Sequence, residues 1–155
     1  MSIVSDIEKL KKEKNAVILA HYYVDEDVQD VADYIGDSFY LSKVATKVSQ
    51  DRIIFAGVEF MGESAKILNP KKRVFMPDMN ADCPMAHMAD KDEILALREK
   101  YDDIAVVCYI NSTAELKKYS DVCVTSSNAV KIVKALPQKN IFFIPDQNLG
   151  DFVRR

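Results

Sequence analysis

The sequence predicts an α/β fold with parallel sheets, and two observations lead to this expectation. Short apolar runs of strand length alternate with helical patterns along the chain, and such runs are typical of strands buried on both faces of a parallel sheet. The 155-residue chain also matches itself when shifted by 88 positions, which indicates two copies of one α/β unit. We therefore expect repeated small three-layer αβα units with parallel sheets, related by pseudo-symmetry.

The first copy is expected to begin with a helix over residues 2–13 and a buried strand over 16–20. Asp25 is expected to cap a second helix, whose apolar positions continue to Ile35 and which Gly36 ends. The remaining expected elements are a helix from Asp37-Ser38 to about residue 48, a strand at 52–58, a helix at 60–68 and a strand at 73–76.

The second copy repeats this pattern 88 residues later, beginning in a strand at 104–110 that follows a helix at about 90–100. Identical pairs such as Asp33/Asp121 and Ser38/Ser126 support the alignment less than the apolar positions, which stay in phase. The chain stops one turn into the last matching helix. The prediction is therefore a first unit at residues 1–83 and a truncated second unit at 84–155, in a fragment of a longer parent.

The amino-acid composition excludes several classes of function. With 21 basic and 24 acidic side chains the net charge is −3, which gives no electrostatic footprint for nucleic acid or anionic lipid. The start of the chain lacks the apolar region of a signal peptide, and no apolar run is long enough for a membrane span, so we expect a cytoplasmic protein. Three cysteines in a reducing compartment argue against a disulfide framework.

The cysteines differ in their surroundings. Cys83 lies in a loop after a short strand and is followed by Pro84, so it is either a small packing residue or a metal or iron–sulfur ligand at the carboxyl end of a strand. Cys108 and Cys123 lie inside apolar runs, and we expect both to pack in the core.

Polar residues follow the predicted strands at equivalent places in both copies. His21, Tyr22 and Tyr23 follow the first strand, and Tyr109 and Asn111 occupy matching places in the second copy. A lone histidine is often structural, but this location also suits a binding or catalytic site. No glycine-rich nucleotide fingerprint and no C-x-x-C motif occurs in the sequence.

Ser38 and Ser126 are equivalent under the repeat, and both are predicted to cap helix N-termini. Capping alone is a sufficient reason for serine at such positions. The alternative is that each hydroxyl, with the free N–H groups behind it, binds an anionic group. Two such sites would suit a ligand with two anionic ends.

Several motifs together resemble quinolinate synthase, from about residue 15 to the last residue: ILAHYY, VADYIGDS, FAGVEFMGESAKILNPKKRVFMPDMNADCPMA, YINSTAELK, TSSNAVKIV and PDQNLG. The resemblance implies three similar α/β domains around a pseudo-threefold axis, of which this chain would hold the first and part of the second. It also implies condensation of iminoaspartate with dihydroxyacetone phosphate to quinolinate, the precursor of the NAD ring. A 4Fe-4S cluster, held by one cysteine from each domain, would act as Lewis acid.

The resemblance also implies roles for individual residues. By position, Cys83 matches the first cluster ligand and Tyr23 the catalytic tyrosine, with His21 and Tyr109 as further proton donors or acceptors. The residues that resemble the substrate-binding set are His21, Ser38, Tyr109, Asn111 and Ser126. The implied partners are the two small substrates and the aspartate-oxidising enzyme that supplies iminoaspartate.

Family members have about twice this length, and only one of the three implied cluster cysteines is present. We therefore expect that this chain alone neither holds the full cluster nor turns over. Two alternatives stay open from the residues themselves. One is a non-catalytic α/β module that binds small dianions at Ser38 and Ser126 without metal, and the other is a purely structural repeat fragment.

Overall fold

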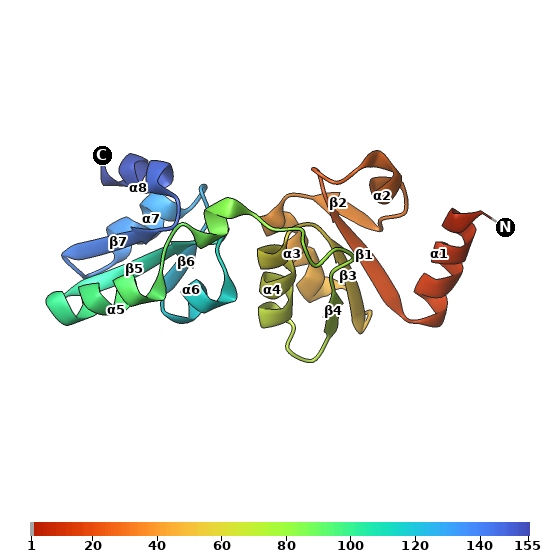
Figure 1. Ribbon diagram of the computed structural model, residues 1–155, viewed down its shortest axis with the longest axis horizontal. Helices are drawn as coiled ribbons and strands as arrows, with labels where there is room; N and C mark the ends of the chain where they lie inside the picture. Colours follow the sequence, from red (N-terminus) through yellow and green to blue (C-terminus); the bar gives the residue numbers. More distant parts are fainter. Residues whose placement is uncertain (1) are drawn as a thin grey trace. The chain divides into compact units, whose positions relative to one another are not determined.

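The computed structural model describes residues 2–155, in which the chain forms two compact units, Met1–Asp82 and Cys83–Arg155 (Figure 1). The sequence places this boundary one residue later, after Cys83. No helix among the described residues is long and apolar enough to cross a membrane.

The first unit alternates helices and strands. Its described elements are α1 (Ile3–Glu13), β1 (Ala16–His21), α2 (Glu26–Asp30), β2 (Tyr34–Gly36), α3 (Ser38–Lys47), β3 (Arg52–Ala56), α4 (Glu59–Leu68) and β4 (Arg73–Phe75). The strands pair in parallel in the order β2-β1-β3-β4. Parallel strands need crossover connections, and the helices between them supply these.

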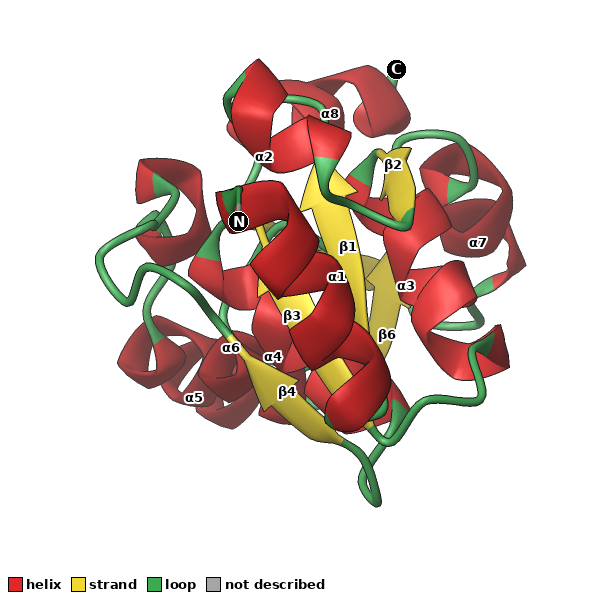
Figure 2. Cartoon of the chain, turned by 90° about the vertical axis from the view of Figure 1, so that its right-hand side faces the viewer, coloured by secondary structure: helices red, strands yellow, loops and turns green. Residues whose placement is uncertain are grey.

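Helices cover both faces of this sheet. Figure 2 shows α1 lying across β1 and β3 on one face. On the opposite face α3 and α4 pack side by side, over strand residues that are almost fully buried: Val17, Leu19, Ile53 and Phe55. The unit is therefore a three-layer αβα sandwich, as the sequence predicts.

The second unit repeats this order. Its described elements are the 3₁₀ helix η1 (Pro84–His87), α5 (Lys91–Lys100), β5 (Ile104–Tyr109), α6 (Ala114–Lys118), β6 (Val122–Val124), α7 (Ala129–Ala135), β7 (Asn140–Ile144) and α8 (Gln147–Arg154). The strands are again parallel, in the order β6-β5-β7. Ile94 of α5 and Leu116 of α6 pack on one face, and α7 and α8 cover the other.

The 88-residue repeat is confirmed by the element bounds and by the pairing register. Strands β5, β6 and β7 begin and end 88 residues after β1, β2 and β3, and α6 does so after α2. The register repeats as well, because Leu19 pairs with Tyr34 and Val107 pairs with Val122. The two halves of the chain are therefore two versions of one α/β unit.

The second helix of the first unit is shorter than its apolar pattern predicts. Helix α2 ends at Asp30, and Tyr34–Gly36 forms strand β2 beside β1. The Asp33 N–H donates to the Ile18 carbonyl, and an Asp33 carboxylate oxygen accepts from the Ile18 N–H at 2.8 Å. The expectation of a helix through Ile35 was wrong because the pairing of β2 with β1 outweighs the helical spacing of the apolar residues. A three-residue strand is too short to show an alternating pattern of its own in the sequence.

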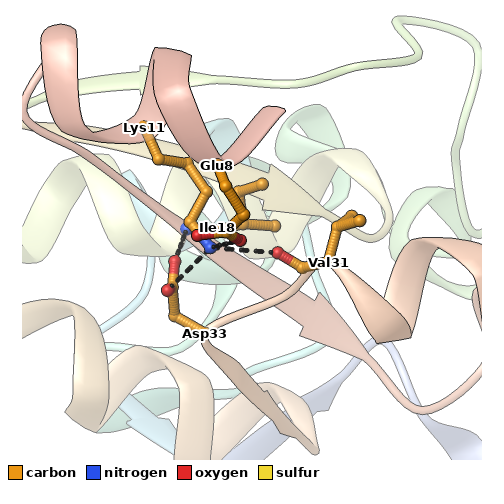
Figure 3. Close-up of polar contacts among 5 residues, drawn as sticks. All are labelled: Glu8, Lys11, Ile18, Val31 and Asp33. Carbon is orange, nitrogen blue, oxygen red and sulfur yellow. Dashed lines mark hydrogen bonds and ion pairs between the residues drawn. The ribbon is translucent and has the colours of Figure 1, made fainter. Parts of the chain in front are cut away.

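A charged contact ties α1 to the same place (Figure 3). The Lys11 ammonium lies 2.9 Å from Asp33 and 2.7 Å from Glu8, and it donates to the Val31 carbonyl at 3.2 Å. Burial opposes the charge, but the two carboxylates outweigh it, so the pKa of Lys11 is raised. This contact holds the α2–β2 connection against the first helix.

Candidate functional site at the carboxyl ends of the strands

His21 is the last residue of β1 and is 8% exposed. It pairs in register with Gly36 of β2, so its side chain lies where two parallel strands end. The Tyr23 ring packs edge-on against it, with 4.6 Å between ring centroids, although Tyr23 itself is 92% exposed. The structure therefore brings together two of the predicted site residues, His21 and Tyr23, at this edge.

The protonation of His21 follows from its contacts. Its Nδ1 accepts a hydrogen bond from the Tyr23 N–H at 3.3 Å, which leaves the proton of the neutral ring on Nε2. Burial lowers the pKa of His21 from 6.5, and the charge of nearby Asp37 works in the opposite direction. At neutral pH the ring is an uncharged group with an N–H donor.

Ser38 is the first residue of α3, but it is not the helix cap. The cap is Asp37, whose carboxylate accepts from the Tyr40 N–H at 2.7 Å. The predicted capping role of Ser38 was therefore wrong by one residue. A carboxylate at this helix start also repels anions, which argues against a simple dianion site made by Ser38 and the helix dipole.

The helix start lies very close to the end of β2. A Cβ at Gly36 would overlap the ring of Tyr40, so glycine allows this ring to pack directly on the end of β2. The ring of Tyr40 thus covers the strand end that pairs with His21.

The second unit presents the equivalent edge with different side chains. Tyr109 ends β5 and pairs in register with Val124, and the Ile110 N–H donates to the Val124 carbonyl at 2.8 Å. Asn111 follows, and its Oδ1 is buried without a hydrogen-bond partner among the residues that the structure describes. Buried amide oxygens are normally bonded, so this atom is suited to accept a hydrogen bond from a ligand.

Ser126 does not cap a helix either. It lies exposed in the turn after β6, and α7 begins three residues later with Asn128 as its N-cap residue. The Thr125 N–H donates to the Asn128 side chain at 2.7 Å, which stabilises this turn. The turn replaces the first turn of the expected helix, so the prediction for Ser126 was wrong, although the hydroxyl stays on the same edge as Val124.

Cys83 lies at the start of η1, directly before Pro84, in extended backbone conformation. The loop leading to it is anchored to the first unit by a hydrogen bond of 2.8 Å from the Glu59 N–H to the Ala81 carbonyl. The thiol is partly buried. Among residues 2–155 no three His, Cys, Asp or Glu side chains gather closely enough to hold a metal ion.

The other two cysteines are close together, which sequence reasoning missed. Cys108 is buried in the core as expected, but Cys123 is exposed, so the prediction that both are core residues was half wrong. The only sequence signal was their equivalent place before the two strand ends. Asp37 was also missed as a charge acting on His21, although its position next to Ser38 indicates a cap.

Parallel αβα units of this kind define the class of α/β proteins, in which ligands generally bind at the carboxyl edge of the sheets. Comparison with known proteins makes this specific. Residues 5–155 match the family described as "Quinolinate synthetase A protein", and the chain belongs to that family.

Proteins named quinolinate synthase are similar along nearly the whole chain. The protein from Fusobacterium nucleatum is 65% identical over 149 residues, which cover 96% of this chain and 50% of the relative. The proteins from Caldicellulosiruptor saccharolyticus and Clostridium novyi are 53% and 58% identical, over 99% and 96% of this chain and 50% and 49% of the relatives. The chain thus spans about half the length of the curated relatives it matches.

Proposed function

We propose that this chain provides the first two α/β units of a quinolinate synthase. The reaction would join iminoaspartate to dihydroxyacetone phosphate, with release of phosphate and water, to give quinolinate for NAD biosynthesis. The observation that carries the proposal is the 65% identity to a protein of that name over 149 residues. The polar strand ends support it, because they offer donors and acceptors for small polar substrates.

We propose Cys83 as a ligand of a 4Fe-4S cluster. A partly buried thiol on a loop with an anchored base fits one position of such a cluster. The described residues contain no group of three possible metal ligands, so a complete cluster would need thiols from outside this chain. When bound, the cluster would supply an iron that polarises a substrate oxygen and assists the loss of water.

His21 would orient a substrate in the first unit. Its neutral ring can donate a hydrogen bond from Nε2 to a carboxylate or carbonyl oxygen, while the Tyr23 N–H holds the ring in place. The Tyr23 hydroxyl is exposed on the same edge and could exchange protons with a bound molecule. We therefore assign substrate binding to His21 and proton transfer to Tyr23.

In the second unit, Asn111 would bind through its unpaired amide oxygen and Tyr109 through its hydroxyl. Ser38, the first residue of α3, would donate to a substrate oxygen beside the Asp37 cap, and Ser126 would donate to a carboxylate or phosphate oxygen from the turn after β6. In this proposal each unit has its own small set of side chains that form hydrogen bonds to substrate. The aspartate-oxidising enzyme that makes iminoaspartate is the expected source of that substrate.

The test joins residues 1–155 to the carboxyl-terminal half of the Fusobacterium nucleatum relative and assays the purified chimera without oxygen. We expect an iron–sulfur cluster and formation of quinolinate. Cys83→Ser should remove the iron, and Tyr23→Phe should lower kcat by about 100-fold, in the range of a lost proton-transfer group. Cys123→Ser is the matched cysteine control and should retain both iron and activity.

A folded chimera that makes no quinolinate would overturn the proposal. Retention of iron and activity by Cys83→Ser would remove Cys83 from the site. The isolated 155-residue chain is expected to be inactive in the same assay, and anion binding by that chain without metal would instead favour the dianion-binding alternative.

A further inference from the structure

Two cysteines of the second unit lie side by side across neighbouring strands. Cys108 of β5 and Cys123 of β6 are direct partners in the parallel register. Neighbouring strands lie about 4.8 Å apart, and partners in register project to the same face of the sheet. This spacing falls within the range of about 4.4–6.8 Å between Cα atoms that a disulfide spans. The backbone therefore already has the geometry for a bond between the two sulfurs.

We propose that Cys108 and Cys123 form a redox-active dithiol that closes to a disulfide when it meets a small-molecule disulfide. The proposal is independent of the proposed function, because neither residue belongs to the substrate or cluster sets.

The sulfur of Cys108 lies beside the Cys123 thiol, the Ser112 hydroxyl and the Tyr109 carbonyl, to which it can donate at 3.5 Å. It accepts a hydrogen bond from the Cys123 thiol, and it lies 2.9 Å from the Ser112 hydroxyl. The Lys117 ammonium is held nearby by a bond of 2.6 Å to the Ser112 carbonyl. The hydrogen bond from Cys123 is the largest influence and lowers the pKa of Cys108 to about 6, although burial opposes it. Cys108 is therefore the more acidic thiol of the pair.

Cys123 holds the proton that the pair shares. Its pKa is raised, first by the hydrogen bond to Cys108 and then by burial. The two thiols also differ in access, because Cys108 is 0% exposed whereas Cys123 is exposed. An oxidant from solution therefore reaches Cys123 first, and Cys108 lies next to it on the neighbouring strand.

The reaction balances as two exchanges. In the first, the proton moves to Cys108, and the Cys123 thiolate attacks one sulfur of the external disulfide and expels a thiolate, which takes up a proton. In the second, the Cys108 sulfur loses its proton and attacks the Cys123 sulfur, which expels the other half as a thiol. Counted from the pair with one shared proton, the chain loses one proton and two electrons, a second proton comes from the solvent, and the external disulfide becomes two thiols.

The first unit shows that the fold does not require cysteines at these places. Ala20 and Ile35 occupy the equivalent positions 88 residues earlier, and they pair in the same register. Packing alone is thus satisfied by ordinary apolar residues. The second unit therefore carries two thiols at positions that apolar residues occupy in the first unit.

The test incubates the chain in glutathione buffers stepped from reducing to oxidising, followed by alkylation in acid and mass spectrometry. We expect two of the three thiols to disappear together, with a mass lower by two hydrogen atoms. After trypsin, peptide 101–117 should be linked to peptide 119–131, and Cys83 should carry the alkyl label.

Matched variants separate this dithiol from other cysteine chemistry. Cys83→Ser should keep the link. Cys108→Ala, which introduces the residue of the first unit, should leave glutathione bound to Cys123 without a link. A wild-type chain that keeps stable glutathione on Cys123, that retains all three thiols in the most oxidising buffer, or that links either cysteine to Cys83 would overturn the proposal.

Discussion

The two units share their backbone plan but differ in how their first helix packs. Ile94 of α5 is fully buried against Val106, Leu116 and Ile144. The equivalent residue of α1 is Asp6, which is exposed, and none of the residues Ile3–Glu13 is buried. An apolar groove of about 480 Å³ lies between α1 and the sheet instead. Strand order and register are thus maintained without equal packing of the covering helix.

A second comparison shows what both units do keep. Asp121 accepts from the Val106 N–H at 2.7 Å, as Asp33 does from the Ile18 N–H at 2.8 Å. Arg98 takes the place of Lys11 and contacts Asp121 at 2.8 Å and the Tyr119 carbonyl at 3.1 Å, although it lies at a different position of its helix. In both units the aspartate accepts from a strand N–H and so fixes the connection before the second strand. The cation that pairs with it comes from a different position of the first helix in each unit.

The largest expected effect lies in the covering helices. Ile94→Ala should lower the free energy of unfolding by about 2–5 kcal/mol, because it leaves a cavity in a closed core. Asp6→Ala, at the equivalent exposed place, should change it by less than about 0.5 kcal/mol. Urea unfolding of both variants checks this, and equal losses would contradict the difference in packing.

The aspartates should matter in both units. Asp33→Ala and Asp121→Ala should each cost about 2–3 kcal/mol, because a strand N–H loses a charged acceptor and a cation loses its partner. Hydrogen exchange followed by mass spectrometry can assign each loss to one sheet. If either variant speeds amide hydrogen exchange equally in both sheets, the assignment of each aspartate to its own sheet is contradicted.

Removal of the two cations should lower the stability of the fold by different amounts. The Lys11 side chain is 11% exposed and contacts two carboxylates, whereas the Arg98 side chain is 34% exposed. Lys11→Met should therefore cost about 1–2 kcal/mol, and Arg98→Met about 0.5 kcal/mol, within the range of exposed ion pairs. Thermal unfolding in low and high salt tests the order, and a larger loss for Arg98→Met would reverse it.

The smallest expected effect concerns His21, whose counterpart in the second unit is Tyr109. Burial lowers its pKa below 6.5, so as the pH falls below 6.5 the unfolded chain takes up a proton before the folded chain does. This contribution to stability is full above pH 6.5 and is lost as the pH falls through the folded-state pKa.

An NMR titration of the His21 ring should give a midpoint below 6.5, and Asp37→Asn should lower it further because a nearby negative charge is removed. His21→Gln should abolish this part of the pH dependence in urea unfolding. A midpoint at or above 6.5 would contradict the neutral ring described here.

Most of the fold could be predicted because the apolar strands and the 88-residue period are long signals. Strand β2 could not, since three residues carry too little pattern to compete with a helical reading. The cap at Asn128 depends on the turn before α7, which the repeat alignment does not contain, whereas Asp37 stands directly beside the predicted cap at Ser38. Sequence reasoning located the polar strand ends, but the protonation of His21 depends on burial and on Asp37.

The same limit applies to the cysteines. Cys108 and Cys123 are far apart along the chain, and only the register of β5 and β6 makes them neighbours. An apolar neighbourhood in the sequence describes both in the same way, whereas in the fold one is buried and the other exposed.

Gly36 has a consequence for any attempt to redesign this protein. Because the ring of Tyr40 occupies the space of a Cβ, even a methyl group there would force that ring, which is 42% exposed, to turn away from the strand end. Turning the ring would uncover the end of β2 next to His21 while leaving the strands and the helix backbone intact. Alanine at this one position would therefore let an engineer change how much of the strand end is exposed.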